Sequence, residues 1–423
     1  MEVVIRPIDA TSVHRICSGQ VVLDLATAVK ELVENSLDAG ATVLEVKLKE
    51  YGSELFEVSD NGPGVAPSNY EGLGLKYHTS KIESFTDLDQ LKSFGFRGEA
   101  LSSLCALSKV TILTRTSGQD SATKLEYDHN GVLVSKSIAA RPVGTTVTVE
   151  KLFSTLPVRH KDFMKNLKRE YARLVTLMQA YALISTNVRL VCTHQTKQAR
   201  SSVVRTQGTG VLRDNLIAVF GAAAGKSLCE TRLALGSDDS CLSGFISRAA
   251  AGCGRSSGDR QFFFLNGRPV DLPKVSKLLN EVYRSYLSGQ FPMAVLDLHL
   301  PTATYDINVT PDKRKVFLHK EQQLLASLRA SLLQLYEPSR STFAAEEMML
   351  NAKKTGVGAP APLAGKRSWT KTNGDCSDQE DQYDSEATDG DNRDDPDPPT
   401  FQCSQPESDV FQSASAARRP SRA

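Results

Sequence analysis

The chain has 423 residues, a formal net charge of +1 and a hydrophobic fraction of 40%. This length predicts two or three domains, and the hydrophobic fraction suffices for a sizeable core. No apolar run is long enough to span a bilayer and no signal-peptide pattern opens the chain, so we expect no membrane partner. The eight cysteines form no CxxC pair or Cys/His cluster, which argues against a zinc site and favours reduced thiols in an intracellular protein.

Charge is distributed unevenly along the chain. Residues 341–423 carry 9 Lys and Arg against 15 Asp and Glu, a net charge of −6, so the first 340 residues carry +7. A basic body favours a polyanionic partner such as DNA, although many intracellular domains are slightly basic and bind no nucleic acid.

A helix is predicted over residues 22–39, after a short and partly apolar lead-in over residues 1 to about 17. Glu31, Asn35 and Asp38 are spaced to share one face of this helix. A carboxylate and an amide oxygen one turn apart can activate a water as a base and ligate a hard cation such as Mg²⁺. Taken alone, the pattern is more typical of a solvated helix face.

Two strands are predicted next, over residues 42–49 and 54–59, and the second ends in a tight Asp-x-Gly-x-Gly turn. Asp60 can accept a hydrogen bond from an exocyclic amine, and Gly62 and Gly64 let the backbone approach a flat ring. Most isolated turns of this kind are only turns.

Residues 66 to about 98 lack periodicity and are rich in glycine, hydroxyl groups and charge, which is typical of a functional connection. A helix is predicted to begin near its end, and the backbone N–H groups of a helix start suit a phosphate. A buried aromatic pair is the simpler interpretation of Phe94 and Phe96. The candidate nucleotide-contacting residues are Thr79, Ser80, Lys81, Gly95, Phe96, Arg97, Gly98 and Glu99.

Residues 110–149 alternate in short runs and predict a β-rich half. Asn130-Gly131 between two such runs is a strong hairpin signal. Thr145 lies at the start of the last run, where its hydroxyl could bond a purine ring nitrogen directly or through water.

The later chain predicts a helix over about 165–183, a polar connection over 195–210 and a second domain beyond it. A buried strand within 259–270 ends in an Asn-Gly turn, and a helix near 273–287 and a strand at 294–300 follow. Strand, helix and strand in this order imply a crossover unit.

Four of these pieces, from the helix over 22–39 to Thr145, together resemble the ATPases of the gyrase, Hsp90, histidine-kinase and MutL superfamily. The closest match is to the MutL family of DNA mismatch repair ATPases, carried by the first 64 residues and by GFRGEALSSLCALSKV. The segment LFSTLPVRHK also matches, with Thr155 and Val158 departing toward the eukaryotic post-meiotic-segregation branch. The resemblance covers roughly four-fifths of the chain, and no P-loop is present.

The resemblance implies an α+β fold with two domains and a tail. We expect a two-layer α/β sandwich ATPase domain of the gyrase/Hsp90/histidine kinase/MutL type over residues 1–205, with a lid at about 66–98. An α/β domain similar to ribosomal protein S5 domain 2, a transducer and DNA-binding domain, is expected over 206–338. Residues 339–423 are acidic and rich in Ser, Pro and Gly, which predicts a disordered linker or tail.

The resemblance also implies roles for single residues beside bound ATP and Mg²⁺. Glu31 would activate the attacking water, and Asn35 would ligate the metal ion. Asp60 would read the adenine amine with the help of Thr145. The stretch DINVTPDKRKV places Lys313 where the family has a lysine that reaches the γ-phosphate, a role suited to a flexible point charge.

The implied function is the ATP-binding and hydrolysing head of a nuclear DNA mismatch repair protein. Its expected partners are DNA, a second MutL homologue as heterodimer partner, and MutS homologues bound to mismatches. No pattern typical of the family's metal-binding endonuclease domain follows Pro338, so we expect a truncated form with slow ATPase activity and no nicking activity. The alternatives are an ATPase-deficient DNA- and partner-binding scaffold and a type II topoisomerase-like ATPase subunit; the GFRGEAL and NVTPDK segments argue against the second.

Overall fold

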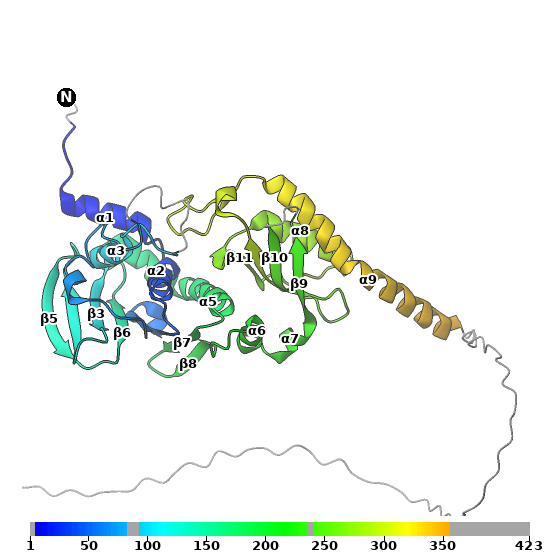
Figure 1. The fold of residues 1–423 in the computed structure, drawn as a ribbon, viewed down its shortest axis with the longest axis horizontal. Helices are drawn as coiled ribbons and strands as arrows, with labels where there is room; N and C mark the ends of the chain where they lie inside the picture. The colour runs from blue at the N-terminus through cyan, green and yellow to red at the C-terminus, as the bar shows by residue number, and fades with distance from the viewer. Residues whose placement is uncertain (1–4, 83–92, 236–239, 356–423) are drawn as a thin grey trace, which may run out of the picture. The chain divides into compact units, whose positions relative to one another are not determined.

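The computed structural model describes residues 5–82, 93–235 and 240–355, with side chains up to residue 338. Two large sheets dominate this part of the chain (Figure 1). The centre of the predicted lid and the predicted tail from residue 356 onward lie outside the described residues. Within them, no helix is both long and apolar enough to cross a membrane.

The first sheet is eight-stranded, in the order β5-β4-β3-β6-β2-β1-β7-β8, and its only parallel pair is β1 with β7. Buried and half-exposed side chains alternate along β1 and β3, so only one face is covered. The strands are β1 (Val43–Lys49), β2 (Leu55–Asp60), β3 (Lys109–Arg115), β4 (Ala122–Tyr127), β5 (Leu133–Ala139), β6 (Gly144–Glu150), β7 (Arg189–Gln195) and β8 (Arg200–Arg205).

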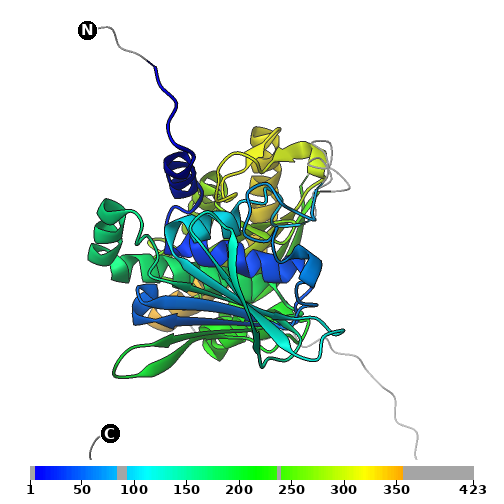
Figure 2. The same cartoon turned by 90° about the vertical axis from the view of Figure 1, so that its left-hand side faces the viewer.

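Helices α2, α3 and α5 lie on the covered face of this sheet, which gives the two layers seen in Figure 2. Their apolar side chains form one core with the inward residues of the strands. The α-helices of the first half of the chain are α1 (Ala10–Val21), α2 (Leu25–Asp38), α3 (Ala100–Leu107), α4 (Pro157–Lys165) and α5 (Leu167–Ile184).

Helix α2 begins later than the predicted residue 22 because Asp24 caps it. The Asp24 Oδ1 atom accepts a hydrogen bond from the Thr27 N–H at 2.7 Å, which satisfies one of the free donors of the first turn. Most of the helix is buried, including three charged residues: Lys30, Glu31 and Glu34. A charged side chain inside a core requires a partner, so these three residues already indicate a special site.

Helix α1 was not predicted, although Val13, Ile16, Cys17 and Val21 recur at helical spacing; in the structure Val13 and Ile16 stay exposed. Asp9 caps it through the Ser12 N–H, and it packs on α3 through small and polar groups. The His14 imidazole lies 3.1 Å from the Ser102 hydroxyl, and Ser18 is fully buried.

The second sheet is five-stranded, in the order β12-β11-β13-β10-β9, and the parallel pair β11 and β13 is joined through α8. The predicted strand–helix–strand crossover is therefore confirmed. The elements of this half are α6 (Leu212–Phe220), α7 (Ala222–Ser227), β9 (Leu228–Ala234), β10 (Cys241–Ser247), β11 (Gln261–Leu265), β12 (Arg268–Val270), α8 (Pro273–Arg284), β13 (Ala294–His299), β14 (Tyr305–Asp306), β15 (Phe317–Leu318) and α9 (Glu321–Thr355).

Both faces of the second sheet are covered. On one face, Phe263 and Leu265 of β11 pack with α8 and α9. On the other, Phe262 and Phe264 pack with α6 and with Leu183 near the end of α5. This second cluster is a shared core that joins the two halves of the described chain.

Helix α9 continues past the predicted boundary at residue 338. It runs to Thr355 with Pro338 inside it, so residues 339–355 are helical and the disorder prediction was wrong for them. The stretch FAAEEMMLNAKK over residues 343–354 is rich in strong helix formers, but a proline just before it usually breaks a helix, so the sequence favoured an end there.

Candidate active site

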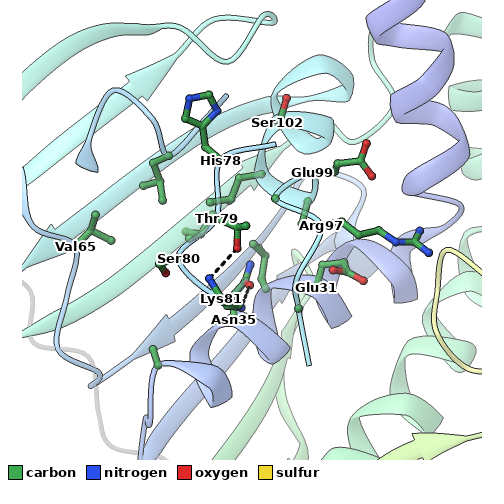
Figure 3. Close-up of a pocket in the computed structure, with 18 of the residues that line it drawn as sticks. Glu31, Asn35, Val65, His78, Thr79, Ser80, Lys81, Arg97, Glu99 and Ser102 are labelled. Atoms are coloured by element: carbon green, nitrogen blue, oxygen red, sulfur yellow. Dashed lines mark hydrogen bonds between the residues drawn. The ribbon is translucent and has the colours of Figure 1, made fainter. Parts of the chain in front are cut away.

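A cavity of about 860 Å³ lies between α2, the turn after β2, the described ends of the predicted lid, and a loop from the second half of the chain. Figure 3 shows Lys81 next to Asn35 of α2, with Thr79 and Ser80 on the same segment as Lys81 and Glu31 elsewhere on the helix. The structure thus brings together residues far apart in sequence. The predicted site residues that line the cavity are Glu31, Asn35, Asp60, Gly64, Thr79, Ser80, Lys81, Gly95, Phe96, Arg97, Gly98, Glu99, Thr145 and Lys313.

Gly62 is the predicted residue that does not line the cavity. Its N–H donates to Asp60 Oδ1 at 2.9 Å, and the Thr145 N–H donates to the same atom at 3.1 Å. The Ser36 hydroxyl donates to the other carboxylate oxygen, Oδ2, at 2.9 Å. The Asp60 carboxylate is therefore fixed in one orientation, and Gly62 acts by holding it.

The backbone of the Asp60 turn is held as firmly as its side chain. The Arg141 Nη2 atom donates to the Asp60 carbonyl at 2.6 Å. Gly64 has φ +78, and a Cβ there would lie 2.2 Å from the Arg115 carbonyl oxygen, so only glycine fits. Ile112 and Val147 give this end of the cavity an apolar wall. A flat ring with one polar edge would fit such a surface.

Two side-chain oxygens on α2 accept hydrogen bonds from one lysine ammonium group. The Lys81 Nζ atom lies 2.9 Å from Asn35 Oδ1 and 2.6 Å from Asp38 Oδ2. Asp38 also accepts the N–H groups of Phe94 at 2.7 Å and Gly95 at 2.9 Å, so it organises the backbone before the predicted phosphate segment. The sequence placed Asp38 on the same helix face as Glu31 and Asn35, but no pattern in it indicated these backbone contacts.

The same oxygens fit the metal ion implied by the resemblance. Among the residues that the structure describes, no three His, Cys, Asp or Glu side chains converge as a metal site would require. Mg²⁺ in nucleotide sites, however, takes few protein oxygens and fills its shell with phosphate and water. Asn35 Oδ1 already interacts with the Lys81 ammonium, which shows that a cation is stabilised beside it.

Glu31 is held between two lysines. Its Oε1 lies 3.0 Å from Lys30 Nζ and its Oε2 lies 3.5 Å from Lys313 Nζ. Burial by itself would raise the pKa of Glu31, but the two ammonium groups outweigh burial and hold the pKa below its usual value. Glu31 is therefore a charged carboxylate at neutral pH.

Lys313 reaches this site from the loop after β14. It is buried, with φ +54, and its Nζ donates to the Phe94 carbonyl at 3.1 Å. Burial lowers its pKa, against the opposing charges of Glu31 and Glu34. Its neighbour Arg314 forms a two-pronged ion pair with Asp271, at 2.5 and 3.1 Å, which anchors the loop.

Arg97, predicted to contact the nucleotide, makes its hydrogen bond outside the cavity. Its guanidinium donates to the Asn308 side chain, in the loop that also carries Lys313. Phe96 is buried, as the simpler interpretation predicts, and the centre of its ring lies 5.2 Å from Lys313 Nζ. Glu99 directly precedes α3, so the predicted helix start is confirmed.

The sequence indicated no place at the site for four buried residues around it: Lys30, Glu34, Tyr181 and Arg268. Lys30 Nζ bonds Glu34 Oε2 at 2.7 Å, and the Tyr181 hydroxyl donates to Glu34 Oε1 at 2.6 Å. A lysine and a glutamate four residues apart read as an ordinary surface pair. The available signal was the apolar character of the helix around them.

Two family models match the chain. One, described as histidine kinase-, DNA gyrase B- and HSP90-like ATPase, matches residues 23–151. The other, described as the C-terminal domain of DNA mismatch repair protein, matches residues 216–337. The first covers α2, the Asp60 turn and β6, and the second covers the second sheet and the loop of Lys313.

Similar proteins come from plants and animals. The chain is 52% identical over 357 residues to DNA mismatch repair protein PMS1 of Arabidopsis thaliana, covering 84% of this chain and 39% of that protein. It is 52% identical over 350 residues to mismatch repair endonuclease PMS2 of Homo sapiens, covering 79% of this chain and 41% of that protein. The chain thus spans about two-fifths of the length of these relatives.

One solved structure is similar over nearly its whole length. The N-terminal domain of a DNA repair protein is 42% identical and aligns with a TM-score of 0.71, covering 78% of this chain and 99% of that one. This similarity and the match to the ATPase family together confirm the predicted fold class.

Proposed function

The chain belongs to the MutL family of DNA mismatch repair proteins, in its PMS1/PMS2-like branch, and from this we propose that it binds and hydrolyses ATP in the cavity described above. The observation that supports this most is the convergence of Glu31, Asn35, Asp60 and Lys313 on one cavity from three separate parts of the chain. ATP hydrolysis needs a general base, a ligand for the metal ion, a hydrogen-bond acceptor for the adenine amine and a cation beside the phosphates.

We propose that the adenine amine donates to Asp60 Oδ2, the oxygen that Ser36 leaves open on one side. Thr145 would assist at a ring nitrogen, directly or through water. Its backbone N–H already holds Asp60, so one residue would serve both the acceptor and the ring.

The triphosphate would extend toward Gly95–Gly98 and Lys313, with Thr79, Ser80 and Lys81 next to that segment. Glu31 would accept the proton of the attacking water while Lys313 stabilises the charge that develops on the γ-phosphate. Asn35 would hold Mg²⁺, which supplies charge neutralisation between phosphate oxygens. Lys81 must then leave Asn35, and a phosphate oxygen is the natural new partner for its ammonium group.

Gly98 is expected to be intolerant of any side chain. It has φ +62, and a Cβ there would lie 2.7 Å from the His78 carbonyl oxygen. Gly98→Ala would push apart the two segments that face the phosphates, so ATP affinity should fall by about tenfold or more. Titration with a fluorescent ATP analogue measures this. Gly118→Ala is the matched control, because Gly118 has open space around it and should leave affinity unchanged.

In the cell, we propose that ATP binding closes the lid at about 66–98 and drives association with the head of a second MutL homologue around DNA. MutS homologues bound to mismatches would be the upstream partners, and the nucleus would be the location. The support is the family membership and the basic balance of the first 340 residues. Hydrolysis would then let the lid open and the two heads separate.

Nucleotide selectivity tests the proposed function directly. The purified chain should hydrolyse ATP with turnover near or below the low end of the common range, about 1 s⁻¹. EDTA should abolish it, and duplex DNA should stimulate it. GTP should bind at least about tenfold more weakly than ATP, because the guanine ring oxygen would face the Asp60 carboxylate without a proton between them. Asp60→Asn should reduce the preference for ATP over GTP. Equal binding of ATP and GTP, or turnover indifferent to EDTA, would refute the proposal and favour a scaffold without ATPase activity.

A further inference from the structure

Arg268 is a buried arginine whose contacts lie mostly outside its own sheet. It begins β12 in the second sheet and is 6% exposed. Its guanidinium reaches the backbone that leads into the Gly95–Gly98 segment, about 170 residues earlier in the chain. None of the roles proposed above for the ATP site involves it.

The guanidinium holds two successive carbonyl groups. Its Nη2 donates to Ser93 O at 3.0 Å and to Phe94 O at 3.2 Å, and its Nη1 donates to Phe94 O at 3.2 Å. Its carbon centre lies 4.9 Å from the centre of the Phe94 ring. A planar fork of donors can grip two carbonyls and a ring at once, which a lysine ammonium cannot do.

The opposite side of the same backbone is held by α2. Asp38 accepts the N–H groups of Phe94 and Gly95, whereas Arg268 donates to the carbonyls of Ser93 and Phe94. The peptide units at Phe94 are therefore gripped from both sides, by the first half of the chain and by the second. Hydrogen bonds with one charged partner are the stronger class, so this grip resists local motion.

A buried carboxylate fixes the orientation of the guanidinium. Arg268 Nη1 lies 3.6 Å from Glu34 Oε1, and Glu34 is fully buried while it also accepts from Tyr181 and Lys30. Burying an arginine at this depth is costly unless its partners are fixed. An arginine that only covered the surface would need none of them.

We infer that Arg268 is a positioning residue for the phosphates of ATP, coupling the second sheet to the Gly95–Gly98 segment. Lys313 also donates to Phe94 O, so when Lys313 turns to a γ-phosphate, Arg268 keeps that carbonyl in place. A small shift of the second sheet would then be passed to the phosphate-facing backbone, where an ångström matters for the reaction. The inference rests on the proposed ATPase function.

Arg268→Lys in the 423-residue chain tests this. It keeps the charge beside Glu34 but loses the fork. We expect kcat for ATP to fall about tenfold or more while KM changes less than about threefold. Without nucleotide, amide exchange in peptides that contain residues 93–98 should become about tenfold faster. Arg284→Lys is the matched control: Arg284 stacks on Phe291 at 4.1 Å in the same half of the chain, away from the cavity, and both readouts should stay unchanged.

Unchanged exchange at residues 93–98, or a kcat equal to that of Arg284→Lys, would overturn the inference. If Arg268→Lys unfolds the whole chain, the double variant Arg268→Gln with Glu34→Gln removes both charges and gives the same two readouts. If the wild-type chain has no turnover, the proposed ATPase function fails, and the exchange comparison alone decides whether Arg268 fixes this backbone.

Discussion

Glu31→Gln is expected to lower kcat for ATP by about 1,000-fold while leaving ATP affinity within about threefold, which is the signature of a lost general base. The carboxylate is the group in the cavity placed to accept a proton beside Lys313. Glutamine keeps the shape of the side chain but cannot accept the proton. Single-turnover hydrolysis and equilibrium binding on the same preparation separate the two effects.

The control for this substitution is Glu54→Gln, an exposed glutamate paired with Lys49 on the outer side of the first sheet. It should have wild-type kinetics. Because Lys30 and Lys313 hold the pKa of Glu31 below its usual value, the carboxylate stays ionised above that value. The wild-type rate should therefore show no acid limb from Glu31 between pH 6 and 8, a range taken from the usual glutamate pKa of about 4.3. A glutamine variant that keeps more than a tenth of the wild-type kcat would contradict the assignment.

Lys313→Met is expected to lower kcat by about 100-fold, because one charged donor to the γ-phosphate is lost. ATP affinity should fall more than ADP affinity, since the lysine would contact the phosphate that ADP lacks. Burial lowers the pKa of Lys313, so the wild-type rate should decline as rising pH removes its proton, and this alkaline limb should begin below the usual lysine pKa. Kinetics across pH, with both nucleotides, measure all three effects.

Lys315→Met is the matched control, two residues along the same loop and exposed to solvent. It should leave kcat and the pH profile unchanged. Equal losses of ATP and ADP affinity in Lys313→Met would mean that the lysine only supports the loop. In that case the strained φ of Lys313 and the Arg314–Asp271 pair would account for its burial.

Local patterns in the sequence predicted the parts of the site that are local in space. The helix bearing Glu31 and Asn35, the Asp60 turn and the start of α3 each depend on a few adjacent residues, and the structure has all three. The crossover of the second sheet was predicted for the same reason. The roles of the site residues remain proposals, because they depend on a ligand.

What the sequence could not predict depends on distant contacts. Arg268 and Phe94 are 174 positions apart, and no periodicity links them. Lys30 and Glu34 read as a surface pair because the second half of the chain, which buries them, cannot be placed from sequence. Helix α1 contacts α3 through the His14–Ser102 pair, and these two residues are 88 positions apart, so no local pattern links them.

The core shared by α5 and the second sheet has a consequence for how this chain can be divided. A cut after β8 would match the end of the first sheet, yet it would expose Ala180 and Leu183 on one fragment. On the other fragment, Phe262 and Phe264 would keep α6 but lose their contact with α5. Each fragment would expose apolar side chains to water and would be prone to aggregate. The two halves therefore cannot be separated at this point without exposing part of their shared core, and an expression boundary is better placed outside it.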